Sequence, residues 1–159
     1  MKYTKFYFLG FILFWYSCAS KETKFSIYKY SLEARVAENF ILNTREKDSL
    51  MLYEYTSAKD SVLPNTYRYL ADKEMLKFKS RTFISTRMKY RFDNYVFTIY
   101  QEETVQDTAV TLVFNKDYGL FASLGFGENF IFTKEEMLPK IEEYNFKRLF
   151  RSLNSVRTE

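Results

Sequence analysis

Between residues 82 and 133 the chain repeats one pattern, in which short stretches with a two-residue period are separated by residues that favour turns. Residues 88–92 read Met-Lys-Tyr-Arg-Phe, so apolar and basic side chains alternate. Successive side chains of a strand point to opposite faces, and this period therefore predicts strands. Residues 110–114 alternate in the same way, and residues 95–101, 120–124 and 130–133 are further predicted strands between the turns. Short neighbouring strands joined by tight turns predict an antiparallel meander.

The residue types between these segments predict tight turns. Asp93 and Asn94 both tolerate the positive φ of a tight hairpin, and residues 115–119 also have turn composition. Residues 125–127 (Gly-Phe-Gly) lack the third glycine of a dinucleotide-binding loop and lie between strands, so they predict another reversal. Both faces of the predicted strands carry aromatic residues, which indicates that something covers part of the second face.

The earlier part of the chain is less clear. Residues 31–42 are rich in helix formers, with Ser31 as a helix cap, although a strand over residues 38–43 competes with this helix. Residues 50–56 predict a strand and residues 58–66 a loop. Residues 67–80 fit either one helix or two strands that reverse at residues 72–74.

After residue 133 the period changes. Thr133 and Glu136 have the spacing of a capping box, and a main helix is expected from Pro139 onwards. Its apolar stripe is formed by Ile141, Tyr144, Leu149 and Leu153. The predicted fold class is therefore α+β: an antiparallel meander of about five to seven strands packed against a C-terminal helix, with a second helix possible near residues 31–42. A β-sandwich or a barrel is the alternative.

The amino-terminal segment has a separate character. Lys2 and Lys5 precede an uncharged run of 11 residues, 6–16, which is apolar or aromatic apart from Gly10. A helix needs about 20 apolar residues to cross a membrane, so this run is too short to span and fits the core of a signal peptide. Ser17 and Cys18 follow, and polar residues begin at position 21.

A basic start, a short apolar run and a small residue before a cysteine resemble the signal of bacterial lipoprotein precursors. At Trp15 the sequence departs from the aliphatic residue that is usual in that class. The resemblance implies cleavage before Cys18, a diacylglyceryl thioether on its sulfur and acylation of its amino group. Two or more acyl chains hold a protein stably on a membrane. The implied organisation is a signal peptide (1–17), a lipidated tether (18–24) and one domain (25–159) in the cell envelope, outside the cytoplasm. A plain signal peptide, an uncleaved anchor or a buried Cys18 are the alternatives.

Several chemistries are excluded by composition. The chain has one cysteine and no histidine, so it can form no internal disulfide, no multi-cysteine metal site and no His-dependent catalytic centre. No cofactor or metal is expected. Without Lys2 and Lys5, the 24 basic residues become 22, against 20 acidic ones, which is too even a balance for a nucleic-acid binder.

The predicted function is a membrane-tethered binding or structural protein that is not an enzyme. Its partners would be membrane lipid, through the acyl chains on Cys18, and an envelope protein or glycan. Tyr90, Tyr95 and Tyr100 are the candidate binding surface, because exposed aromatics can stack on sugars or peptides.

Two other functions remain open. One is an envelope enzyme that acts on glycans or peptides without histidine, and the other is an inhibitor or immunity-type protein with a protruding loop at 58–66 or 102–107. Adjacent carboxylates, as at Glu102 and Glu103, are not evidence of catalysis, because neighbours on a strand point to opposite faces. The basic residues Lys147, Arg148 and Arg151 match the negative end of the predicted last helix.

Overall fold

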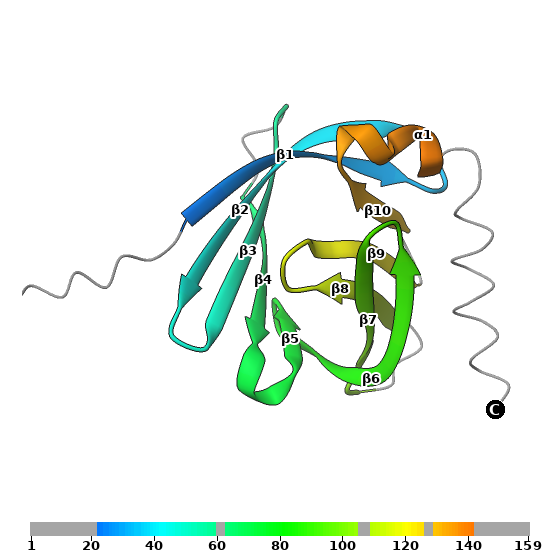
Figure 1. Cartoon of the computed structure of the whole chain (residues 1–159). Coiled ribbons are helices and arrows are strands. Elements are labelled where there is room, and N and C mark those ends of the chain that lie inside the picture. The colour runs from blue at the N-terminus through cyan, green and yellow to red at the C-terminus, as the bar shows by residue number, and fades with distance from the viewer. Residues whose placement is uncertain (1–21, 60–62, 105–108, 126–128, 142–159) are drawn as a thin grey trace, which may run out of the picture.

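The computed structural model describes residues 22–59, 63–104, 109–125 and 129–141, and these residues form a closed antiparallel barrel of ten strands (Figure 1). Each strand pairs with its neighbours in sequence, and β1 closes the barrel by pairing with β10. The strands are β1 (Glu22–Ser31), β2 (Ala37–Lys47), β3 (Leu50–Ser57), β4 (Asn65–Leu70), β5 (Met75–Phe78), β6 (Arg81–Phe92), β7 (Tyr95–Glu102), β8 (Val110–Asn115), β9 (Gly119–Gly125) and β10 (Phe130–Thr133).

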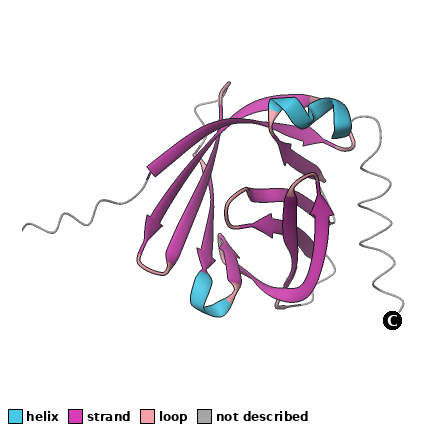
Figure 2. Ribbon diagram, in the orientation of Figure 1, coloured by secondary structure: helices cyan, strands magenta, loops and turns pink. Residues whose placement is uncertain are grey.

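The predicted α+β class is wrong, and the barrel that stood as its alternative is what forms. Helical turns are confined to η1 (Ala71–Lys73), η2 (Glu135–Met137) and α1 (Leu138–Lys140) within the described residues (Figure 2). A closed barrel leaves no unpaired strand edge, so every described strand is hydrogen-bonded on both sides. In the described part of the chain, no helix is both long enough and apolar enough to cross a membrane.

The helix predicted near residues 31–42 is wrong. Ser31 does accept a hydrogen bond at its Oγ from the Ala34 amide, at 3.3 Å, but Arg35 takes a φ of 55° and the chain reverses there. β2 then begins at Ala37 and pairs along its length with β1. The competing strand over residues 38–43 is therefore confirmed, because burial of Phe40 inside the barrel outweighs local helix propensity.

The capping box at the carboxyl end does not form. Thr133 is the buried last residue of β10, and its hydroxyl donates to the Lys134 carbonyl oxygen at 3.2 Å. No side chain caps η2. Within the described residues the sheet is closed on itself rather than packed on a C-terminal helix, which overturns that part of the prediction. The remainder of the predicted helix, with its stripe and its basic end, lies outside the described residues.

Other local predictions are confirmed. Residues 67–80 form two strands, with the reversal in η1 and at Glu74, which has a φ of 45°. Asp93 and Asn94 make the β6–β7 turn, where Asp93 has a φ of 51°. In the β8–β9 turn the Asn115 Oδ1 atom accepts from the amides of Asp117 and Tyr118 at 2.8 and 3.0 Å.

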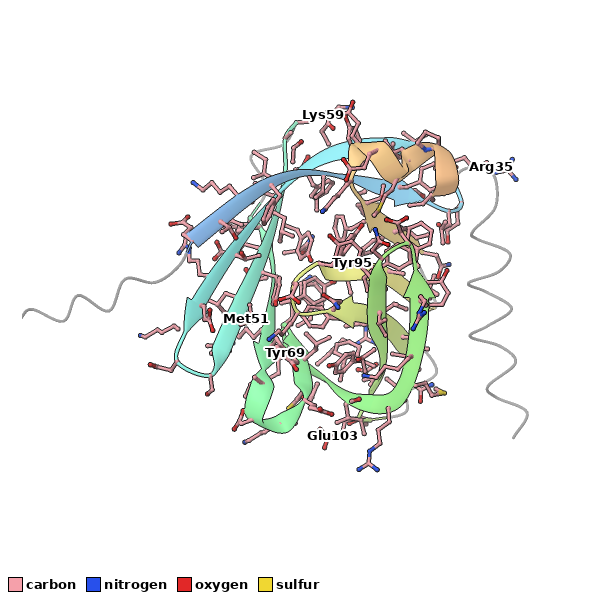
Figure 3. The ribbon with its side chains drawn as sticks, in the orientation of Figure 1. Arg35, Met51, Lys59, Tyr69, Tyr95 and Glu103 are labelled. Atoms are coloured by element: carbon pink, nitrogen blue, oxygen red, sulfur yellow. The ribbon has the colours of Figure 1, made fainter. Side chains whose placement is uncertain are left out.

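Two clusters of buried side chains occupy the two sides of the barrel wall. The inner cluster receives residues from all ten strands, among them Tyr53, Tyr55 and Phe114, so side chains fill the interior (Figure 3). The outer cluster lies on the opposite face of β7–β10 and is centred on Phe97 and Phe121. It is covered by residues of β1, β6 and the segment after β10, which explains why both faces of these strands carry aromatics.

Candidate functional site

The two ends of the barrel differ in their connections. At one end, here called the closed end, the β2–β3 and β6–β7 turns are two residues long and β1 begins. At the other end, here called the mouth, lie the three longest connections of the barrel, β1–β2, β3–β4 and β7–β8, together with the β9–β10 connection and the two-residue β5–β6 turn. Binding residues in barrels are commonly carried where such longer connections meet, which makes the mouth the end to inspect.

A cavity of ≈ 200 Å³ opens at the mouth. It is lined from β1, β4, β5, β6, β8, β9 and β10, so nearly the whole circumference of the barrel contributes to it. On one side Tyr67 and Phe78 stack with ring centroids 4.4 Å apart. On the other, Phe130 packs edge-on against Phe132 at 5.2 Å. The cavity walls are therefore largely aromatic.

The floor of this cavity is the filled interior of the barrel. Tyr55 stacks on Phe132 with a centroid distance of 4.3 Å and meets Tyr67 edge-on at 5.7 Å. The Tyr55 hydroxyl accepts a hydrogen bond from the buried Leu120 amide at 2.7 Å, which fixes the ring in place. Burial raises the pKa of Tyr55 well above its ordinary value, so this hydroxyl stays neutral. The cavity is thus a cup that ends on a rigid aromatic layer.

Two cationic side chains reach the rim of the cavity. Lys29 lies two residues after the buried Ile27 on β1 and therefore faces the same side of the strand, and its Nζ atom lies 4.7 Å from the ring centroid of Phe130. The Arg81 guanidinium lies 5.6 Å from the Phe83 ring. Both contacts are cation–π contacts, and they hold positive charge against the aromatic wall.

Carboxylates accompany these two cations. Arg81 donates two hydrogen bonds to Glu102, of which the one from Nε to Oε1 measures 2.7 Å. This bidentate pairing lowers the pKa of Glu102 below its ordinary value and raises that of Arg81. Glu38 stands opposite Lys29 in the β1–β2 register and is exposed. The rim therefore carries both signs of charge above an aromatic cavity.

One carboxylate of this rim, Glu102, is committed to an ion pair. Glu102 is ionised and held by Arg81, so it is a poor proton donor near neutral pH. Among the described residues, no group of three or more carboxylate or cysteine side chains is arranged to hold a metal ion. What the arrangement offers is apolar surface with polar groups at its edge, which is the composition of a ligand pocket.

The three tyrosines proposed from the sequence do not form one exposed row. Tyr100 points into the inner cluster and is 3% exposed, while Tyr90 lies in the outer cluster and is 7% exposed. Tyr95 is partly exposed near the closed end, where its hydroxyl accepts from Lys134 Nζ at 3.0 Å. Cys18, the proposed lipidation site, lies outside the described residues.

Sequence reasoning missed the mouth residues, although a signal for them existed. Phe25, Ile27 and Lys29 share one face of β1, and Arg81 shares a face of β6 with the buried Phe83. A charged residue that continues an inward-facing apolar series marks the place where the interior meets solvent. This pattern identifies mouth residues only once it is known which face of each strand points inward.

No protein-family model, curated protein or solved structure matches this chain. The geometry of the mouth is therefore what supports a proposal of function.

Proposed function

We propose that the chain is a non-enzymatic binding protein of the cell envelope, tethered through Cys18, whose barrel mouth receives the apolar body of a small amphipathic ligand. The observation that carries this proposal is the aromatic cavity of ≈ 200 Å³ with charged groups at its rim. A closed barrel with a filled floor and an open mouth is built to hold one small molecule.

The size of the cavity restricts the ligand. An apolar protein cavity of about 150 Å³ is known to hold benzene, so ≈ 200 Å³ suits one ring or a short alkyl chain. Phe78, Phe83 and Phe130 line the cavity and supply apolar surface for such a group. Transfer of the apolar body from water contributes about 0.8 kcal/mol per buried methylene. The charged rim keeps the polar end of the ligand in contact with solvent.

Binding is tested by isothermal titration of the full chain with 1-hexanol. Ser123 lines the cavity and is 8% exposed, so Ser123→Phe is expected to fill the cavity and weaken 1-hexanol binding at least about tenfold, a loss of about 1.4 kcal/mol. Ser26→Phe places the same ring on the exposed outer face of β1 and should leave binding unchanged.

A second variant keeps the test of binding valid if Ser123→Phe does not fold. Phe130→Ala enlarges the cavity, so it should shift the preference from 1-hexanol towards 1-octanol. If the unaltered chain binds neither alcohol, or if Ser26→Phe weakens binding as much as Ser123→Phe does, the mouth is not a ligand pocket.

The proposed tether is shorter than the sequence indicates. β1 begins at Glu22, so residues 22–24 of the predicted tether are already paired with β2. Residues 19–21 separate Cys18 from this strand, a reach of at most about 14 Å. Since β1 starts at the closed end and runs about 30 Å to the mouth, a chain anchored at Cys18 would present its mouth away from the anchoring membrane.

The tether is tested by mass spectrometry of the mature amino terminus. The expected product begins at Cys18 and carries acyl chains, and Cys18→Ser should abolish both the cleavage and the acylation. An intact Met1 together with an unmodified Cys18 thiol would refute the anchor and leave the pocket proposal standing.

A further inference from the structure

A second cavity, of ≈ 170 Å³, lies on the outside of the barrel over β4 and β5 and is here called the outer groove. Its charged lining residues are Arg68, Lys77 and Lys79, and none of its lining residues is acidic. The outer groove shares Asn65 and Phe78 with the mouth cavity, so one continuous wall joins the two.

The cations of the outer groove are placed against each other. Arg68 on β4 stands directly opposite Lys77 on β5 in the strand register. Side chains in such a pair have Cβ atoms about 5 Å apart, and like charges there destabilise the sheet. The next residues in the same cross-strand row are Leu52 on β3 and Thr82 on β6, and neither carries a charge.

One acidic side chain on the same face, Glu54, is engaged elsewhere. Glu54 on β3 stands opposite Thr66, one step along β4 from Arg68 on the same face. Its Oε2 atom lies 3.5 Å from Arg45 Nη2 and accepts from Asn43 Nδ2 at 3.3 Å. The Arg68–Lys77 repulsion is therefore not relieved within its own row or by this carboxylate.

Protection of a strand edge does not explain the charges. Lysine on an exposed edge strand prevents pairing with other chains, but β4 and β5 are interior strands of a closed barrel. The outer groove also contains Lys79, whose φ of 53° belongs to the two-residue β5–β6 turn. Its ammonium group lies 5.2 Å from the centroid of the Phe78 ring, at the wall that both cavities share.

We propose that the outer groove binds a phosphate monoester group, and that this group belongs to the ligand whose apolar body enters the mouth. This proposal rests on the proposed function. A phosphate monoester carries a charge of about −1.5 to −2 at neutral pH and offers three acceptor oxygens. It can neutralise both Arg68 and Lys77, whereas a singly charged group leaves one cation uncompensated. The planar guanidinium of Arg68 suits two oxygens of the same phosphate.

The two cavities then take the two ends of one molecule. The apolar part lies against Phe78 inside the mouth, and the phosphate lies on the outer face of β4 and β5, on the other side of the wall that Asn65 and Phe78 form. The recognised chemistry is a short alkyl or aromatic phosphate, whether it comes from a lipid, a sugar carrier or a free metabolite.

The test titrates the full chain with hexyl phosphate, hexyl sulfate, 1-hexanol and inorganic phosphate. Hexyl phosphate should bind at least about tenfold more tightly than 1-hexanol and more tightly than hexyl sulfate, which has the same shape but one charge. In the double variant Arg68→Gln/Lys77→Gln, hexyl phosphate should weaken about 10- to 100-fold while 1-hexanol is unchanged. Inorganic phosphate, which has no apolar body, should bind more weakly than hexyl phosphate.

The matched control is Lys47→Gln/Lys73→Gln, which removes two exposed charges at the closed end. This control should leave hexyl phosphate binding within about twofold, because it alters only the net charge. Equal loss in both double variants, or hexyl sulfate binding as tightly as hexyl phosphate, overturns the phosphate proposal. So does inorganic phosphate binding as tightly as hexyl phosphate. Normal 1-hexanol binding without any gain for hexyl phosphate overturns this inference alone, whereas absence of 1-hexanol binding overturns the proposed function.

Discussion

Replacement of Gly119 by alanine should destabilise the barrel strongly, because both the backbone angle and the space at this position disfavour a side chain. Gly119 begins β9 with a φ of 92°, in the region that L residues avoid. A Cβ atom there would lie 2.6 Å from the Tyr55 Oη atom and 3.3 Å from Leu42 Cδ2. Tyr55 cannot yield easily, because it accepts from the Leu120 amide at 2.7 Å and stacks on Phe132.

The expected cost has two parts. The positive φ contributes about 1–2 kcal/mol, and insertion of a methyl group into a packed interior contributes about 1–3 kcal/mol. Gly119→Ala should therefore lower the free energy of unfolding by about 2–5 kcal/mol, which corresponds to a fall in Tm of roughly 6–20 °C for a domain of this size. Urea unfolding, monitored by far-UV circular dichroism, measures this decrease in the free energy of unfolding.

A double-mutant cycle with Tyr55→Phe separates the two parts. Tyr55→Phe alone should cost about 1–3 kcal/mol, because the buried Leu120 amide loses its acceptor. It also removes the oxygen that the new methyl group would meet, so the double variant should be more stable than the sum of the single effects predicts, by about 1–3 kcal/mol. Strict additivity of the two costs would show that the contact with the hydroxyl is not what forbids a side chain at Gly119.

Three further results are expected. Glu102→Gln should cost about 1–3 kcal/mol at pH 7, because the amide keeps one acceptor oxygen for Arg81 but loses the second acceptor and the negative charge. Arg81 lowers the pKa of Glu102, so this contribution is present above the unfolded pKa of about 4.3 and is lost as pH falls. The urea midpoints of the variant and the unaltered chain should therefore converge at low pH. Burial raises the pKa of four tyrosines, Tyr53, Tyr55, Tyr100 and Tyr118, so they resist ionisation in the folded chain. Because the unfolded chain ionises its tyrosines above about pH 10, the free energy of unfolding should fall there. An unchanged urea midpoint up to about pH 12 contradicts this. Phe121→Ala should cost about 3–5 kcal/mol in the same assay, because Phe121 is fully buried at the centre of the outer cluster, and a loss below about 1 kcal/mol would mean that this cluster adds little to the fold.

The second half of the barrel was largely predictable from sequence. Residues 88–92 of β6 and 110–114 of β8 alternate with a period of two, and the β6–β7 turn carries Asp93, whose φ is 51°. These signals are local, because a strand and its hairpin partner lie next to each other in the chain. The amino-terminal strands were harder, since residues 31–42 favour a helix by propensity and become turn and strand only when Phe40 is buried against residues of other strands.

Residue patterns alone therefore predicted the strands and reversals between residues 82 and 133 and excluded disulfide and histidine chemistry. Closure of the sheet could not be predicted in this way, because the pairing of Tyr28 with Thr133 joins segments far apart in the chain and leaves no local pattern. Closure also fixed which side of each strand faces inward. Because of this orientation, Tyr100 is buried and Lys29 and Arg81 lie at the rim of the mouth. Arg68 and Lys77 lie side by side on the outside of the barrel. A two-residue period gives two faces but does not say which one is inside, and the packing of all ten strands around one interior supplies the answer.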